Sequence, residues 1–136
     1  DPDLDALLDA AAAVSPDGPT FDATDDRFLA PDDMAAEIIA AAGRPTGADR
    51  ATIVRCAVES MADTTAALGD WLGAPAIRVV GGGARAQLFV QALARRSGRP
   101  VSVGPAEATA LGNAMVQGIG LGLYPDLGWA RRLTRS

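Results

Sequence analysis

Three consecutive glycines, Gly81, Gly82 and Gly83, form the stretch of this sequence most suited to binding chemistry. They separate an apolar, β-rich run at residues 77–80 from a helical pattern at residues 85–97. Glycine loses the most conformational entropy when it is ordered, so flexibility alone explains three glycines poorly. A glycine-rich turn between a strand and a helix lets a ligand approach the backbone and directs amide groups at an anion. The alternative is a tight strand-to-helix turn without a ligand.

Two nucleotide-binding interpretations of this turn compete. Residues 81–86, GGGARA, fit the relaxed dinucleotide fingerprint G-x-G-x-x-A. That fingerprint needs an acid near the end of the next strand, but here the strand is followed by Gly104 and Pro105, and Glu107 lies beyond them. The match to an NAD-type domain is therefore weak. A phosphate loop of the form GxxxxGK[ST] is excluded, because the chain has no lysine.

The composition excludes several classes of chemistry. There is no histidine, which rules out a Ser-His-Asp triad, a Cys-His pair and histidine-ligated metals within this chain. Cys56 is the only cysteine, so neither a disulfide framework nor a cysteine zinc site is expected, and it should pack as a small hydrophobic residue. A net charge of −5 argues against general nucleic-acid binding. No apolar run is long enough to span a membrane, and we expect a cytoplasmic protein.

The glycines lie inside a predicted strand–helix–strand unit. A strand at 77–80, a helix at 85–97 ended by Gly98, and a strand at 101–103 should give two parallel strands with a right-handed crossover. A long helix at 50–73, capped by Asp49, precedes them. Its predicted buried stripe is Ile53, Ala57, Met61 and Leu68.

The N-terminal third is predicted to hold two helices and a loop. The helices cover residues 1–14, with Asp1 as a possible cap, and residues 32–43, followed by a loop at 44–49. One face of the first helix and the loop between the two helices carry apolar residues expected to reach a core. These are Leu4, Leu7, Leu8 and Ala11 on the helix, and Phe21, Phe28 and Leu29 in the loop.

Small residues recur every four positions along a predicted helix at 105–122. Glycine inside a helix costs about 1 kcal/mol against alanine, so its repeated use suggests very close packing against another backbone. An ordinary buried helix is the alternative, and a last helix follows at 126–136. The two stripes are Ala106, Ala110, Ala114, Gly118 and Gly122, and beside them Ala108, Gly112, Val116 and Gly120.

Two strands beside about five helices make an incomplete α/β core, because parallel strands need cover on both faces and further neighbours. We therefore expect this chain to be a piece of a larger protein. The stretch VVGGGARAQLFVQALARRSGRPVSVGPAEATALGNAMVQGIGLG at residues 79–122 resembles the C-terminal domain of FGGY-family carbohydrate kinases. The pattern GP-x-EATALGN-x-x-VQ favours the rhamnulokinase subfamily over the xylulokinase and glycerol kinase subfamilies.

The resemblance implies an α/β fold that is part of an actin-like ATPase (ribonuclease H-like) domain. Residues 1–136 would be the C-terminal part of the second, nucleotide-side domain, without the N-terminal sugar-binding domain. The complete enzyme would use ATP and Mg²⁺ to phosphorylate a ketose, L-rhamnulose to L-rhamnulose 1-phosphate, or a related sugar such as xylulose. Gly81, Gly82 and Gly83 would be the adenosine motif, and the helix beginning at Glu107 would cross a counterpart near an interdomain hinge.

Two features limit what can be carried over to this chain. Ala84, Arg85 and Ala86 stand where relatives commonly have a small residue and a polar pair, so Arg85 would stack on adenine or meet a phosphate instead. The general base and most magnesium contacts would lie upstream of Asp1, so no catalytic or metal-binding residue is expected here and the chain alone should be inactive. Three acids are not assigned to these roles and are expected to be loop or solvated-helix acids: Asp25, Asp26 and Asp63. A non-catalytic α/β interaction module stays open as an alternative.

Overall fold

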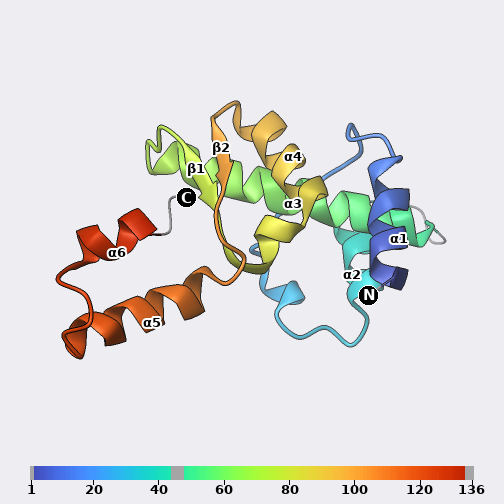
Figure 1. The fold of residues 1–136 in the computed structure, drawn as a ribbon. Coiled ribbons are helices and arrows are strands. Elements are labelled where there is room, and N and C mark those ends of the chain that lie inside the picture. Colours follow the sequence, from blue (N-terminus) through green and yellow to red (C-terminus); the bar gives the residue numbers. More distant parts are fainter. Residues whose placement is uncertain (1, 44–47, 134–136) are drawn as a thin grey trace.

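The computed structural model describes residues 2–43 and 48–133 (Figure 1). The predicted cap at Asp1, part of the 44–49 loop and the end of the last predicted helix lie outside these residues. A helix-rich body carries a small parallel sheet, and two C-terminal helices extend away from it (Figure 1). In chain order the elements are α1 (Pro2–Ala12), η1 (Asp26–Phe28), α2 (Met34–Ala41), α3 (Arg50–Trp71), β1 (Ile77–Val79), η2 (Gly81–Arg85), α4 (Gln87–Ser97), β2 (Val101–Val103), α5 (Ala108–Gly120) and α6 (Leu127–Leu133).

The predicted strand–helix–strand unit is confirmed. β1 and β2 pair in parallel, with Ile77 opposite Val101 and Val79 opposite Val103. The helix α4 connects the two strands and packs against them and α3. The main hydrophobic core lies between these elements and consists of Ala62, Val79, Ala92 and Leu93.

Local signals place the ends of the helices as expected. The Asp49 carboxylate accepts a hydrogen bond from the Thr52 amide at 2.8 Å and caps α3, as predicted. Gly98 ends α4 with a left-handed φ of 59°. Such a conformation is unfavourable for a residue with a Cβ, so glycine is the natural terminator there.

A second cluster packs the N-terminal loop onto α2 and α3. Cys56 is buried beside Ile38, and the rings of Phe21 and Phe28 lie 4.7 Å apart against them, so these three predicted core residues are confirmed. Leu29 is exposed, because it follows η1 on the outside of the loop, and its predicted role in the core is wrong.

The predicted buried stripe of α3 is partly wrong. Ile53 and Ala57 contact the second cluster, but Met61 and Leu68 are 52% and 53% exposed. The buried face instead includes Glu59, which is only 2% exposed. Tertiary contacts explain this difference. The last turn of α4 places two arginines against this face of α3, and their ion pairs with Glu59 keep the face buried.

These ion pairs connect α3 and α4. Glu59 pairs with Arg55 at 2.9 Å, with Arg96 at 2.7 Å and with Arg95. Arg96 also contacts both carboxylate oxygens of Asp63, at 2.7 and 2.8 Å, so the expectation that Asp63 is merely solvated is wrong. Burial raises the pKa of Glu59, but hydrogen bonds and charges from the α4 arginines outweigh it, and the pKa lies below its ordinary value.

The helices α5 and α6 form an arm that packs mainly within itself (Figure 1). The ring of Tyr124 stacks on Trp129 at 4.9 Å between centroids and lies against Gly118. A Cβ on Gly118 would come within 2.6 Å of that ring, which explains this glycine.

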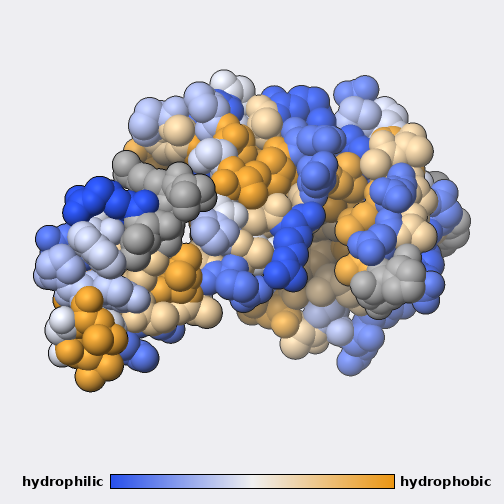
Figure 2. Space-filling model, viewed as in Figure 1, coloured by the Kyte–Doolittle hydropathy of each residue, from blue (hydrophilic) through white to orange (hydrophobic). Residues whose placement is uncertain are grey.

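Most other members of the two small-residue stripes are exposed in this chain, including Ala110, Ala114 and Val116. Hydrophobic residues also gather at the tip of the arm (Figure 2), where Leu121 and Leu123 are exposed.

No helix in the described part of the chain is both long enough and apolar enough to cross a lipid bilayer.

Candidate functional site

The candidate site lies where the two parallel strands end. β1 is followed by Val80 and the η2 turn, and β2 is followed by the loop of residues 104–107. Two backbone hydrogen bonds hold the exits together: the Gly104 amide donates to the Val79 carbonyl at 2.8 Å, and the Gly81 amide donates to the Pro105 carbonyl at 3.2 Å. In open α/β sheets, ligands bind outside the carboxyl ends of the strands. The triple glycine therefore occupies the expected place for a ligand.

The three glycines differ in what requires them. Gly81 has a left-handed φ of 74°, which disfavours any residue with a Cβ. A Cβ on Gly83 would meet the Val79 side chain at 3.6 Å, an ordinary contact. Gly82 has neither constraint: its φ is outside the left-handed region, and a Cβ there would meet nothing within 4 Å. The described fold thus gives a reason for Gly81 and none for Gly82.

The turn is longer and more regular than predicted. Residues 81–85 form a 3₁₀ helix, and α4 begins at Gln87 instead of at residue 85. Ala86 interrupts the two helices with φ −83° and ψ 83°, and it provides no side-chain cap for α4. The glycines therefore lie in a short helical turn that leads directly to an N-terminus whose first amides have no side-chain acceptor at the cap position.

Arg85 lies beside the glycines but is paired with an acid. Its Nη2 atom is 2.9 Å from Oε1 of Glu107, which directly precedes α5. Both side chains are well exposed, at 71% and 76%. The dinucleotide fingerprint requires an acid nearer the end of the strand than Glu107 is. In this structure Glu107 pairs with Arg85 instead. Its pairing was missed from the sequence, because only the parallel register of β1 and β2 brings residues 22 positions apart together.

A hollow of about 400 Å³ opens between α1 and the start of α4, next to the turn. Arg85 is the one cation among the described residues that line it, while carboxylates and amides supply hydrogen-bonding groups. The only sequence signal for its acids is their spacing of four on one face of α1. The lining residues are Asp5, Leu8, Asp9, Ala12, Arg85, Gln87, Leu88 and Gln91.

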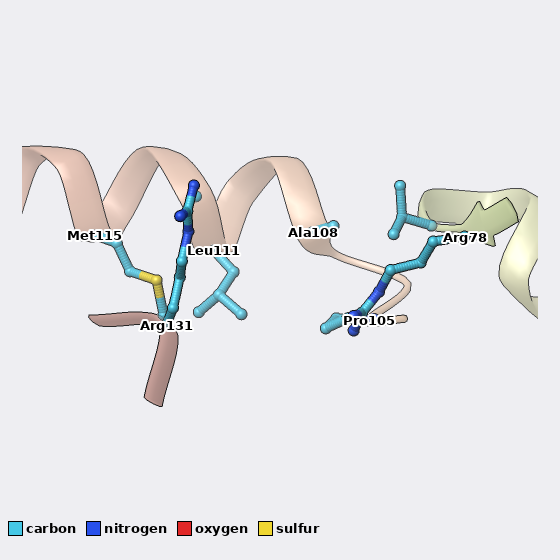
Figure 3. Close-up of a pocket in the computed structure, with 8 residues that line it drawn as sticks. Arg78, Pro105, Ala108, Leu111, Met115 and Arg131 are labelled. Atoms are coloured by element: carbon cyan, nitrogen blue, oxygen red, sulfur yellow. The ribbon is translucent and has the colours of Figure 1, made fainter. Parts of the chain in front are cut away.

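A second groove, of about 380 Å³, lies between β1 and α5 (Figure 3). Arg78 reaches over Pro105 at one end, and Arg131 of α6 lies beside Met115 at the other (Figure 3). The floor between them is apolar, with Leu111 and Ala108. The strand ends thus lie next to two separate hollows, a polar one lined by residues of α1 and α4 and a largely apolar one lined by residues of β1 and α5.

Comparison with known proteins identifies the family. The model of the C-terminal domain of the FGGY family of carbohydrate kinases matches residues 1–121, which include both strands and the glycine turn. The chain belongs to the FGGY family of carbohydrate kinases. The predicted resemblance is confirmed.

Several proteins named rhamnulokinase are similar to this FGGY-family chain. One from Bacteroides thetaiotaomicron is 35% identical over 136 residues, which cover 93% of the chain and 28% of that protein. One from Klebsiella pneumoniae strain 342 is 36% identical over 85% of the chain and 25% of that protein. One from Pectobacterium carotovorum is 34% identical over 96% of the chain and 28% of that protein. The chain therefore spans about a quarter of the length of these relatives.

Within the described part of this FGGY domain, no group of three or more cysteine, aspartate or glutamate side chains is arranged to hold a metal ion. Asp25 caps η1 through the Arg27 amide at 3.0 Å and pairs with the Arg27 side chain at 3.1 Å, so it has a structural role at a loop.

Proposed function

We propose that this chain is the nucleotide-side wall of an ATP-dependent sugar kinase. Residues 1–136 would be the C-terminal part of its second domain, of the actin-like ATPase (ribonuclease H-like) type, and an N-terminal sugar-binding domain would complete the cleft. The observation that carries the proposal is Gly82, a glycine at the carboxyl ends of the strands for which the fold itself provides no reason. Bare backbone at such a position suits close approach of a ligand.

The proposed reaction is phosphorylation of the 1-hydroxyl of L-rhamnulose. Its support is the name that the similar relatives share, at about 35% identity over this domain. Another sugar of the family, such as xylulose, is the runner-up, since the residues that contact the sugar are expected in the complementary domain. Activity in a cytoplasmic setting is part of the same proposal.

The residues present fit an adenine nucleotide. Gly81, Gly82 and Gly83 offer backbone to the adenosine, and the polar hollow beside the turn offers Gln87 and carboxylates to donors on the base or ribose. Bound ATP supplies the phosphoryl group, and in phosphoryl transfer the protein contributes mainly position and charge stabilisation. This chain would hold and orient the nucleoside. The general base and the magnesium contacts are proposed to come from the other part of the enzyme.

Measurements of nucleotide binding distinguish the kinase from two other candidate functions. An NAD-type domain would need a carboxylate for the ribose hydroxyls, and the carboxylate nearest the turn, Glu107, is paired with Arg85. A non-catalytic interaction module would need no nucleotide at all. Preferential binding of ATP over NAD supports the kinase, the reverse supports the dinucleotide domain, and binding of neither supports the module.

The decisive variant is Gly82→Val in the full-length protein, assayed with ATP and with L-rhamnulose or xylulose. Because a side chain fits the fold here, the melting temperature should be kept, while the KM for ATP rises tenfold or more, the change that about 1.4 kcal/mol of steric conflict produces. Gly81→Ala is the matched control: its left-handed φ should cost roughly 1–2 kcal/mol of stability. Normal ATP kinetics in Gly82→Val would leave the triple glycine as a plain turn.

The 136-residue chain alone should show no turnover, and turnover near 1 per second or above would mean that catalytic residues lie within it.

A further inference from the structure

One ion pair joins the two loops that leave the sheet. Arg85 is the last residue of η2, after β1, and Glu107 immediately precedes α5, after β2. Their Nη2–Oε1 distance is 2.9 Å, and the hydrogen bond from the Gly81 amide to the Pro105 carbonyl ties the same two loops. Arg85 also lines the polar hollow next to the glycine turn. The guanidinium is therefore held at the border between the turn and the hollow.

We infer that Glu107 is a positioning residue, which holds the guanidinium of Arg85 flat against the purine base of the nucleotide. The inference rests on the proposed function of the glycine turn as the adenosine site. A free arginine at 71% exposure would sample many rotamers and would lose that freedom on binding. A carboxylate that already restrains one end of the guanidinium reduces this loss, while the planar face stays available for stacking.

The charges favour the base over the phosphates as the partner of Arg85. The carboxylate of Glu107 offsets the positive charge of Arg85, and Asp5 and Asp9 line the same hollow. A triphosphate placed there would be close to three carboxylates with one arginine to offset them, which is unfavourable. A neutral purine carries no such penalty, and arginine stacks well on aromatic faces.

The test is the binding of adenosine, ADP and ATP to the full-length protein, measured by calorimetry. Arg85→Ala should weaken all three by a similar factor, about two- to fivefold, because the lost contact is with the shared base. Arg85→Lys should behave like Arg85→Ala, since lysine keeps the charge and loses the plane. Glu107→Gln should weaken all three about twofold, as expected for an exposed ion pair. Adding Glu107→Gln to Arg85→Ala should change nothing further, because Glu107 acts only through Arg85.

Asp25→Asn is the matched control, because it breaks another exposed pair, Asp25 with Arg27, outside the hollow, and should leave all three affinities unchanged. A loss that grows from adenosine to ATP would assign Arg85 to the phosphates and overturn the inference. So would an additive loss in the double variant. If the wild type binds the nucleotides and Gly82→Val blocks them while the Arg85 and Glu107 variants bind normally, the inference fails and the proposed function stands. If the wild type binds none of the three, both fail.

Discussion

Glu59→Gln should destabilise the fold more than any other single charge removal in the described chain. The carboxylate is 2% exposed and joins one arginine of α3 to two of α4. Glutamine has nearly the same shape, so packing is kept while the negative charge is lost. Arg55 is itself buried, and its Nε already has no hydrogen-bond partner within the described residues. The substitution therefore leaves a buried cation without its counter-charge.

Breaking one side of a buried ion pair typically costs about 3–5 kcal/mol. For a chain of 136 residues, the usual unfolding entropy per residue converts this cost to a fall in melting temperature of about 10–17 °C. Circular dichroism melts and urea titrations at pH 7 measure it. The control is Asp70→Asn, which removes a carboxylate that is 69% exposed and paired with Arg99. It should cost no more than about 1 kcal/mol. Equal stability of the two variants would refute the assignment of Glu59 as the central charge of the body.

The same network predicts a pH dependence with a definite sign. The α4 arginines keep the pKa of Glu59 below its ordinary value despite burial, which acts in the opposite direction. A carboxyl group with a depressed pKa in the folded state stabilises the fold fully above its unfolded pKa, near 4.3 for glutamate. That contribution is lost as the pH falls through the folded pKa. The stability gap between wild type and Glu59→Gln should therefore narrow below about pH 4, and a gap that widens on acidification would contradict the argument.

Two further predictions concern glycines of the arm. Gly118→Ala should lower the melting temperature, because the new Cβ would lie 2.6 Å from the Tyr124 ring and overpacking costs roughly 1–3 kcal/mol. Gly120→Ala is the control: a Cβ there meets nothing within 4 Å, so the melting temperature should stay the same or rise. Gly112→Leu should not lower the melting temperature of this chain, because a Cβ there meets nothing within 4 Å and leucine favours a helix more than glycine does. It should impair turnover of the full-length protein if this helix face meets another helix there, and unchanged kinetics would remove the hinge role of α5.

The sequence predicted what depends on local chemistry. Asp49 and Gly98 mark the ends of α3 and α4 because a cap and a left-handed residue act within one helical turn. The parallel pairing of β1 and β2 follows from the helix between them. The three consecutive glycines of the sequence predicted the position of the turn. The structure adds that the backbone conformation requires glycine at Gly81 but not at Gly82.

Features that depend on distant partners were missed. Met61 looked like a core residue by its spacing, yet it is exposed because the ion pairs of Glu59 with α4 decide which face of α3 is buried. The pairing of Arg85 with Glu107 required the register of two strands, and the polar hollow required α1 to pack beside the start of α4. Periodicity reports a face of a helix, but only the tertiary partner determines whether that face is covered.

The helix α4 connects the two charged features of the body. Its N-terminus follows the η2 turn and Arg85, and its last turn supplies Arg95 and Arg96 to the buried carboxylate of Glu59. The buried network fixes the far end of α4 on α3, so the position of the glycine turn relative to the core is set by a rigid helix of 11 residues. The loop before α5, by contrast, contacts this turn through the exposed ion pair of Arg85 with Glu107 and the backbone hydrogen bond from Gly81 to Pro105. A perturbation of Glu59 should therefore act on stability, whereas a perturbation of Glu107 should act on ligand affinity while stability changes little.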